Sequence, residues 1–471
     1  MFLIKRKSDG SVDRYKARLV AQGFSQRPGF DFQETYASTL KWATLRAILA
    51  YAAIEDLEIE SVDISSAFLN GEIDSEVYMR QPEGFPQGSP SQVLHLKNSI
   101  YGLRQSPRLW HKKLNSVLVS LGFKKIKSDA SVWVYDREGV RIILPVFVDD
   151  MTLVSKSKEK IADLKEELKK HFKLRDLGPT EFLLGVKVER DRHNRTLHLS
   201  QQQYVLDILK RYNFDSCTPV QTPLNPGTSL SHEQCPKTPE EVDSMRTVPY
   251  SHAVGSLMYL AISTRPDIAY AVGVLSRFSS NPGMAHWAAV KHLFRYLKGT
   301  MDYKLTYKPD PSSPSLFTTY SDADHGGCKD SGKSTGAYVV KMGTGAVSWR
   351  SKLQTIVALS TTEAEYIAAT SAGQELLFLH SLFTELGLDL SSTSHPLHID
   401  NLSAVAVAKN PEHHGRMKHL DLRFFWLRDE VEKNVISIHH CPTDSMPADI
   451  LTKALPLQKV QACCKLLGVG K

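Results

Sequence analysis

Val146-Phe147-Val148-Asp149-Asp150-Met151 lies between two apolar runs, residues 141–145 and 152–154. Apolar, β-branched runs on both sides of a polar pair predict two strands joined by a tight turn. Two adjacent aspartates at such a turn repel each other, and a divalent cation there would neutralise them. Because aspartate is also a favoured turn residue, these residues alone leave an ordinary polar turn open as the alternative.

A second stretch, residues 57–71, adds a third carboxylate. Its residues up to Ile64 alternate as a half-buried strand does, and the pair Ser65-Ser66 then offers a helix N-cap. Asp63 is therefore expected near a strand end among apolar neighbours, where a lone carboxylate is costly without a partner or a metal. If this strand lies beside the first hairpin, three carboxylates converge, which is what a two-Mg²⁺ phosphoryl-transfer site needs.

The composition is that of a folded protein of two or three domains. The chain has 471 residues, of which 42% are hydrophobic and 23% charged, so it is too long for one core and too apolar for disorder. Its 58 basic and 51 acidic residues leave a net charge of +7, a mild excess that favours a polyanionic partner. No apolar run is long enough to span a bilayer, and the N-terminus does not have the pattern of a secretory signal.

The cysteines are predicted to be reduced thiols in an intracellular protein, because they show no CxxC pair and no spacing suited to zinc. The six are Cys217, Cys235, Cys328, Cys441, Cys463 and Cys464.

Two linkers and a change of pattern divide the rest of the chain. Residues 218–249 and 309–314 are rich in proline and polar residues, as linkers are. After the second linker, residues 336–340 and 346–352 are expected to form a hairpin, and residues 355–359 a short strand. Strands and helices then alternate, an order of elements that matches a ribonuclease H fold.

Four acidic residues in the last third fall on separate elements. Asp322 and Asp400 each end an apolar strand, and Asp449 stands at the start of a helix. Residues 360–363 form a capping box, which gives the glutamate there a structural role, so Glu365 is the better candidate ligand. Any one of these acids alone is more often a surface residue, but four in this context indicate a metal site.

Five motifs in the first third resemble the reverse transcriptases of copia-type retrotransposons. They are residues 14–24, residues 63–71, residues 77–85, residues 99–110, and Phe147-Val148-Asp149-Asp150. The resemblance continues through residues 265–270, 292–300, 320–324, 345–349, 357–366, 418–423 and 448–455. It therefore covers nearly the whole chain, from about Phe2 to about Leu455.

The resemblance implies an α+β multidomain protein, a right-hand polymerase with fingers, palm and thumb followed by a ribonuclease H-like α/β domain. Fingers and palm would occupy residues 1–199, a mostly helical thumb or connection residues 200–312, and the ribonuclease H-like domain residues 313–471. The implied activity is extension of a DNA primer on an RNA template from dNTPs, with cleavage of the RNA strand in the RNA–DNA hybrid. The implied cofactor is Mg²⁺, with Mn²⁺ as the alternative, and two-metal chemistry is implied for both activities.

The same resemblance assigns roles to individual residues. The implied catalytic metal ligands are Asp63, Asp149 and Asp150 in the polymerase, and Asp322, Glu365, Asp400 and Asp449 in the nuclease. Phe68 matches the aromatic residue that crowds the sugar 2′ position, with plain core packing as the alternative. The residues implied to contact template, primer or nucleotide are Lys16, Arg18, Phe68, Tyr101, Gly102, Arg104 and Gln105.

The chain departs from the family pattern at three positions, none of them an implied metal ligand. Ser38 and His325 stand where proline and tryptophan are usual, and Phe425 where histidine is common. The alternative hypothesis is an inactive transposon remnant that only binds nucleic acid, against which the seven intact carboxylates argue. An integrase fits less well, because the polymerase motifs come first and no His/Cys zinc module is present. We expect part of a longer polyprotein or a truncated copy, in a cytoplasmic particle, the nucleus or both.

Overall fold

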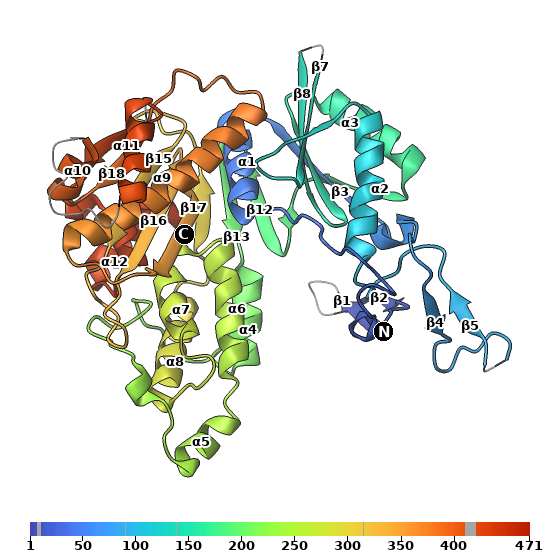
Figure 1. Ribbon diagram of the computed structural model, residues 1–471, viewed down its shortest axis with the longest axis horizontal. Helices are drawn as coiled ribbons and strands as arrows, with labels where there is room; N and C mark the ends of the chain where they lie inside the picture. Colours follow the sequence, from blue (N-terminus) through green and yellow to red (C-terminus); the bar gives the residue numbers. More distant parts are fainter. Residues whose placement is uncertain (7–10, 90, 138, 314, 410–420) are drawn as a thin grey trace. The chain divides into compact units, whose positions relative to one another are not determined.

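In the computed structural model, the predicted hairpin lies inside a six-stranded antiparallel sheet of order β10-β3-β9-β8-β7-β6 (Figure 1). β8 (Val140–Phe147) and β9 (Asp150–Ser155) are joined by the turn at Val148 and Asp149. β3 (Glu58–Ile64) pairs antiparallel with β9. The other strands are β6 (Lys124–Lys125), β7 (Val132–Arg137) and β10 (Leu174–Pro179). The strands expected on both sides of Asp149 and up to Ile64 are confirmed.

The chain divides into two compact units. The first comprises Met1–Leu40 and Glu58–Thr180, and the second comprises Lys41–Leu57 and Glu181–Lys471. The structure describes residues 1–6, 11–89, 91–137, 139–313, 315–409 and 421–471. Among the described helices, none combines the length and the apolar character that crossing a membrane requires. All six cysteines are free, as predicted.

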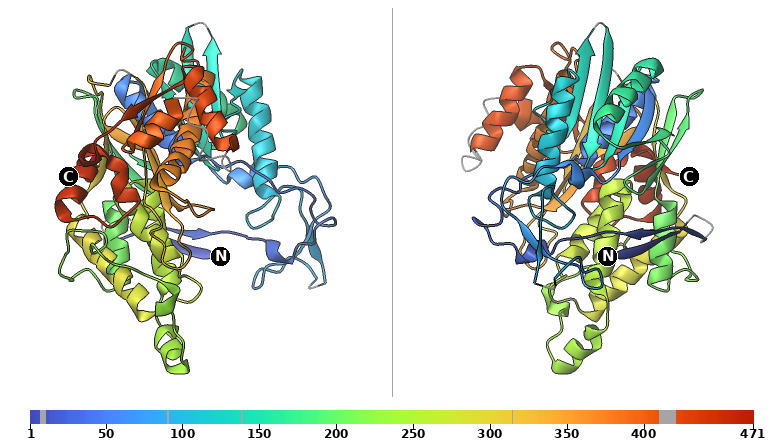
Figure 2. Two further views of the ribbon diagram at one scale, coloured as in Figure 1. Left: turned by 60° about the vertical axis from the view of Figure 1, so that its left-hand side comes forward. Right: turned by 90° about the vertical axis from the view of Figure 1, so that its right-hand side faces the viewer.

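Two helices cover one face of the six-stranded sheet. α2 (Ser106–Ser120) and α3 (Lys158–His171) lie beside the strands (Figure 2, right). Both helices share one apolar core cluster with Val62 of β3 and Met151 of β9. Because successive strand residues point to opposite faces, the neighbouring Asp63 and Asp150 belong to the other face of the sheet.

The rest of the first unit consists of short elements. They are β1 (Phe2–Arg6), β2 (Val12–Ala17), β4 (Tyr78–Arg80), β5 (Val93–His95) and the 3-10 turns Gly23–Ser25 and Ala67–Asn70. β1 pairs with β2 and β4 with β5. A helical turn does begin after Ser66, as predicted, but it is the 3-10 turn Ala67–Asn70, and Ser66 has φ +57° and makes no side-chain capping hydrogen bond.

The second unit contains a five-stranded mixed sheet of order β17-β16-β15-β18-β19. β15 pairs antiparallel with β16 and parallel with β18. The strands are β15 (Thr318–Ala323), β16 (Thr335–Met342), β17 (Gly345–Leu353), β18 (His395–Ile399) and β19 (Ile436–His440). The β16–β17 hairpin is confirmed, but residues 355–359 form no strand, so that prediction is wrong.

Helices of this domain pack on and around the mixed sheet. The long α9 (Thr361–Glu385) contacts β15, β16 and β18, and its N-terminus is capped by the Ser360 side chain, which accepts from the Glu363 backbone N–H at 3.2 Å. The others are α10 (Leu402–Lys409), α11 (Asp421–Glu432), the 3-10 turns Thr443–Ser445 (η7) and Pro447–Leu451 (η8), and α12 (Leu457–Leu466).

A second sheet and a helical bundle complete the second unit. The sheet has the order β11-β12-β13-β14-β20, from Phe182–Leu183, Val186–Asp191, Thr196–Ser200, Lys304–Tyr307 and Val469–Gly470. α4 (Gln202–Arg211), α6 (Tyr250–Ser263), α7 (Ala269–Ser276) and α8 (Met284–Gly299) share one apolar core. Shorter helical segments are His232–Gln234, α5 (Pro239–Arg246) and Pro266–Ile268.

Two segments from the first 200 residues pack with the second unit. Strands from residues 182–200 join β14 and β20 in one sheet, so they pack with the second unit. α1 (Trp42–Ile54) also packs there, against β13, β14, β17 and α9. Arg46 of α1 is 3% exposed, donates to the backbone oxygens of Val347 (2.8 Å) and Ser263 (2.9 Å), and lies 3.7 Å from the Trp349 ring centre.

We predict that Arg46→Met destabilises the second unit by about 3 kcal/mol or more, because buried backbone carbonyl oxygens lose their donors. In hydrogen-exchange mass spectrometry, protection of β17 and α6 should fall, while protection of β8 and β9 should stay unchanged. Arg350→Met removes an exposed arginine from the same sheet and serves as the matched control. Equal protection of β17 in the Arg46 and Arg350 variants would contradict the assignment of α1 to this unit.

Candidate active sites

The first candidate site lies at the tip of the β8–β9 hairpin and consists of Asp63, Asp149 and Asp150, here called the hairpin triad. Asp63 lies directly opposite Asp150 in the β3–β9 pairing. The backbone oxygen of Asp149 accepts a hydrogen bond from the backbone N–H of Ile64 at 2.9 Å, which ties the turn to the end of β3. Burial, followed by the charges of Asp149 and Asp63, raises the pKa of Asp150 to about 6. The negative charges of Asp63 and Asp149 therefore make ionisation of Asp150 less favourable.

The turn that presents the triad is held in an unfavourable backbone conformation. Val148 has φ +58°, which is costly for a β-branched residue. The buried Trp110 of α2 donates from its indole Nε1 to the Val148 backbone oxygen at 2.8 Å. Sequence reasoning missed Trp110, although a buried indole N–H needs an acceptor and could have signalled it.

Three of the residues predicted to contact the nucleotide lie in contact with one another beside the triad. The Arg18 guanidinium lies 5.0 Å from the centre of the Tyr101 ring. The Tyr101 ring in turn lies 4.8 Å from the Phe68 ring. Burial raises the pKa of Tyr101, and the nearby charges of Asp149 and Asp63 raise it further. The structure thus brings Arg18, Tyr101 and Phe68 together beside the acids.

Gly102, Arg104 and Gln105, which were also predicted to contact substrate, pack against the backbone of residues 21–31. Gly102 has φ +95°, and a Cβ there would lie 2.1 Å from the Ala21 backbone oxygen, so only glycine fits. The Arg104 Nε donates to the Gly23 backbone oxygen at 2.8 Å. Gln105 is 1% exposed, and its side-chain amide donates to the Asp31 backbone oxygen at 3.0 Å. A direct contact of these residues with substrate stays a prediction.

The remaining positions singled out from the sequence lie apart from the metal ligands or outside the described residues. Ser38 accepts a hydrogen bond from the Ser131 hydroxyl at 3.0 Å, and His325 is exposed. The side chains of Lys16, in β2, and Phe425, in α11, lie outside the described part of the chain.

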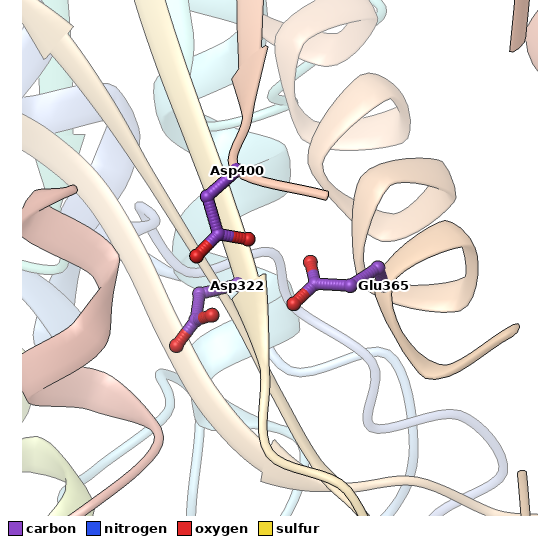
Figure 3. Close-up of side chains that lie close together, drawn as sticks. All are labelled: Asp322, Glu365 and Asp400. Atoms are coloured by element: carbon purple, nitrogen blue, oxygen red, sulfur yellow. The ribbon is translucent and has the colours of Figure 1, made fainter. Parts of the chain in front are cut away.

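The second candidate site gathers acids from three elements of the mixed-sheet domain (Figure 3). Asp322 lies in β15, Glu365 in the first turns of α9, and Asp400 directly after β18. One carboxylate oxygen from each lies within 4.8 Å of the others, and their carboxylates point toward one another. Within the described residues this acidic cluster is the one group with such spacing.

The acidic cluster has the electrostatics of a cation site. The Glu365 Oε1 accepts a hydrogen bond from the Ala323 backbone N–H at 3.2 Å, whereas its buried Oε2 has no hydrogen-bond partner. Burial, followed by the charges of Asp322 and Asp400, raises the pKa of Glu365 well above its usual range. Burial likewise raises the pKa of Asp322, which is 1% exposed. A buried carboxylate oxygen without a partner, next to two other carboxylates, fits a divalent cation.

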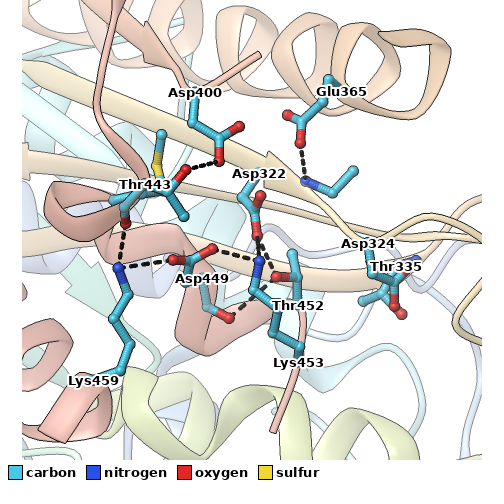
Figure 4. Close-up of polar contacts among 12 residues, drawn as sticks. Asp322, Asp324, Thr335, Glu365, Asp400, Thr443, Asp449, Thr452, Lys453 and Lys459 are labelled. Atoms are coloured by element: carbon cyan, nitrogen blue, oxygen red, sulfur yellow. Dashed lines mark hydrogen bonds and ion pairs between the residues drawn. The ribbon is translucent and has the colours of Figure 1, made fainter. Parts of the chain in front are cut away.

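Asp449, the fourth predicted ligand, is paired with two lysines rather than joined to the acidic cluster (Figure 4). Its Oδ1 lies 2.6 Å from the Lys453 Nζ, and its Oδ2 lies 3.0 Å from the Lys459 Nζ. Thr452 donates from its hydroxyl to Asp322. Sequence reasoning missed these basic residues, although Lys453 follows Asp449 at the i,i+4 spacing of helical ion pairs. Metal binding by Asp449 stays a prediction.

Comparison with known proteins gives the class of the chain. Residues 1–226 match the family model described as reverse transcriptase (RNA-dependent DNA polymerase). The chain is 45% identical over 472 residues to the retrovirus-related Pol polyprotein from transposon TNT 1-94 of Nicotiana tabacum. It is 38% identical over 474 residues to the one from transposon RE2 of Arabidopsis thaliana. Both alignments cover 100% of this chain, and they cover 35% and 32% of the two relatives.

A shorter relative is covered completely. The chain is 32% identical over 317 residues to a transposon Ty5-1 protein of Saccharomyces cerevisiae, which is 67% of this chain and 100% of that protein. The chain therefore belongs to the family of copia-type retrotransposon Pol polyproteins and contains their reverse transcriptase domain. It spans about a third of the length of the tobacco and Arabidopsis polyproteins.

We predict that a divalent cation bound by the acidic cluster displaces a proton at neutral pH. Because the pKa of Glu365 is raised well above neutral, the metal-free cluster holds that proton, and the cation affinity must rise with pH, by about tenfold per unit for one proton. Calorimetry of Mn²⁺ binding in buffers of different ionisation enthalpy should give about one proton released per ion at pH 7.

For this measurement the hairpin triad is silenced by Asp149→Asn with Asp150→Asn, since Asp150 also has a raised pKa. Glu365→Gln is the matched variant, because it keeps an oxygen for the Ala323 N–H but carries no ionisable proton. A cation affinity that does not change between pH 6 and pH 8 would contradict the prediction.

Proposed function

We propose that this chain is an RNA-directed DNA polymerase that copies RNA into DNA at the hairpin triad and cuts the RNA of RNA–DNA hybrids at the acidic cluster. The observation that carries the proposal is the opposition of Asp63 and Asp150 across paired strands, in a domain that matches reverse transcriptases. The ribonuclease H-like sheet and the buried Glu365 oxygen without a partner support the nuclease half.

In the polymerase centre, the protein's own residues position the acids and the nucleotide. Trp110 and the Ile64 backbone hold the turn, so that Asp149 and Asp150 stay beside Asp63. Two divalent ions, Mg²⁺ or Mn²⁺, when bound there would stabilise the charge on the attacking and leaving oxygens of the phosphoryl transfer. The primer and template would lie on the sheet face opposite α2 and α3, where Asp63 and Asp150 belong.

The contacting side chains of Arg18, Tyr101 and Phe68 would set nucleotide selectivity. We propose that Phe68, supported by the Tyr101 ring at 4.8 Å, crowds the sugar 2′ position and so disfavours ribonucleotides. Arg18 carries a positive charge 5.0 Å from the centre of the Tyr101 ring and would contact the dNTP triphosphate.

In the nuclease centre, hydrogen bonds orient the carboxylates that would hold a divalent ion. The Asp400 Oδ2 accepts from the Thr443 hydroxyl at 3.1 Å, and the Glu365 Oε1 accepts from the Ala323 N–H. Such outer contacts fix ligand geometry in metal sites. We propose that the RNA strand of a hybrid lies across this cluster, and that the activity is intracellular, in a cytoplasmic particle, the nucleus or both.

We predict Mg²⁺-dependent extension of a DNA primer on an RNA template by the full chain, and cleavage of the RNA in a labelled hybrid. Asp150→Asn should lower the extension rate by about a thousandfold or more and leave hybrid cleavage intact. Asp322→Asn should have the opposite effect, because the two centres use separate carboxylates. Primer extension and hybrid cleavage are followed on denaturing gels.

Asp136→Asn, an exposed change in the same sheet as the hairpin triad, is the control and should alter neither rate. Hybrid binding without extension in either Mg²⁺ or Mn²⁺ would instead support the hypothesis of an inactive remnant. Extension that survives Asp150→Asn would show that the polymerase centre lies elsewhere.

A further inference from the structure

A lysine side chain lies between two buried carboxylates of the nuclease centre. The Lys453 Nζ is 2.6 Å from the Asp449 Oδ1 and 3.5 Å from the Asp322 Oδ2 (Figure 4). Asp322 and Asp449 are each 1% exposed and come from different elements, β15 and η8. The ammonium group therefore connects the carboxylates of two separate elements.

A second lysine occupies the remaining oxygen of Asp449. The Lys459 Nζ lies 3.0 Å from the Asp449 Oδ2 and also donates to the Thr443 backbone oxygen. The Thr443 hydroxyl in turn donates to the Asp400 Oδ2 at 3.1 Å. Both oxygens of Asp449 are thus in ion pairs, so a metal ion bound by Asp449 would have to share these oxygens with two ammonium groups.

The balance of charge in the centre matches one divalent cation. Asp322, Glu365, Asp400 and Asp449 carry four negative charges when ionised, and Lys453 and Lys459 carry two positive charges. The difference of two negative charges is neutralised by a single divalent ion. Four carboxylates without the lysines would match two such ions, as in sites that clamp both the attacking and the leaving oxygen.

We propose that Lys453 takes the place of a second metal ion, so that the nuclease centre binds one divalent cation among Asp322, Glu365 and Asp400. Lys453 then supplies the positive charge between Asp322 and Asp449, and Lys459 fixes Asp449 for that contact. This inference rests on the proposed hybrid nuclease, but the number of bound ions is measurable without any cleavage.

The test counts Mn²⁺ ions by electron paramagnetic resonance in the full chain with the hairpin triad silenced by Asp149→Asn and Asp150→Asn. Ions that are lost when Asp322→Asn is added belong to the nuclease centre. We expect one such ion, with the spectrum of an isolated Mn²⁺. Adding Lys453→Met removes the ammonium at nearly constant length, and we expect two ions with spin coupling, because ions in two-metal sites lie about 3.5–4 Å apart.

Two further variants separate the charge of Lys453 from its packing. Lys453→Arg keeps the positive charge and should keep one ion. Lys465→Met removes an exposed lysine of α12 and should also keep one ion. The metal dependence of hybrid cleavage in the unchanged chain should likewise follow the binding of a single ion.

The number of bound Mn²⁺ ions tests the role of Lys453 separately from the presence of the metal site. Two coupled ions before any change at Lys453 would overturn the lysine assignment and leave the nuclease proposal standing. A single ion in the Lys453→Met variant would also overturn it, since the site would then not need the ammonium group. No ion that depends on Asp322 would overturn the metal site itself and, with it, the proposed nuclease.

Discussion

Repulsion between carboxylates that share a partly buried site is the constraint on which both centres depend. In the hairpin triad, the register of β3 and β9 places Asp63 opposite Asp150, and the pKa of Asp150 is raised to about 6. In the acidic cluster, a buried oxygen of Glu365 has no hydrogen-bond partner. Such arrangements lower the stability of the folded chain, and a bound cation is what offsets the repulsion.

The surrounding structure holds these acids in place without neutralising them all. At the hairpin, Trp110 donates to the backbone of the strained Val148 rather than to a carboxylate. In the mixed-sheet domain, backbone and hydroxyl donors each occupy one oxygen of Glu365 and Asp400 and leave the other available. Asp449 differs, because both of its oxygens are paired with lysines. The two centres therefore differ in how much positive charge the protein itself supplies.

Local sequence patterns predicted several strands and turns correctly. The features that they missed depend on contacts between residues far apart in the chain. The β8–β9 hairpin and the strand that ends at Ile64 follow from apolar periodicity and turn residues, and the structure has them. The apolar run at residues 355–359 is too short for its pattern to distinguish a strand from a loop. The placement of α1 depends on the carbonyl groups that Arg46 meets about 300 residues later. The lysines on Asp449 likewise become visible only in the folded chain, apart from the i,i+4 spacing of Lys453.

The melting temperature of Glu365→Gln, with and without Mg²⁺, tests most directly whether repulsion at the acidic cluster is relieved by a cation. Without metal, the variant should melt at or above the temperature of the unchanged chain, because Glu365 must take up a proton when it is buried at neutral pH and a glutamine need not. With Mg²⁺, the unchanged chain should gain stability as the cation binds the folded state, and the variant should gain much less. A variant that melts lower without metal and keeps the full Mg²⁺ gain would contradict the account.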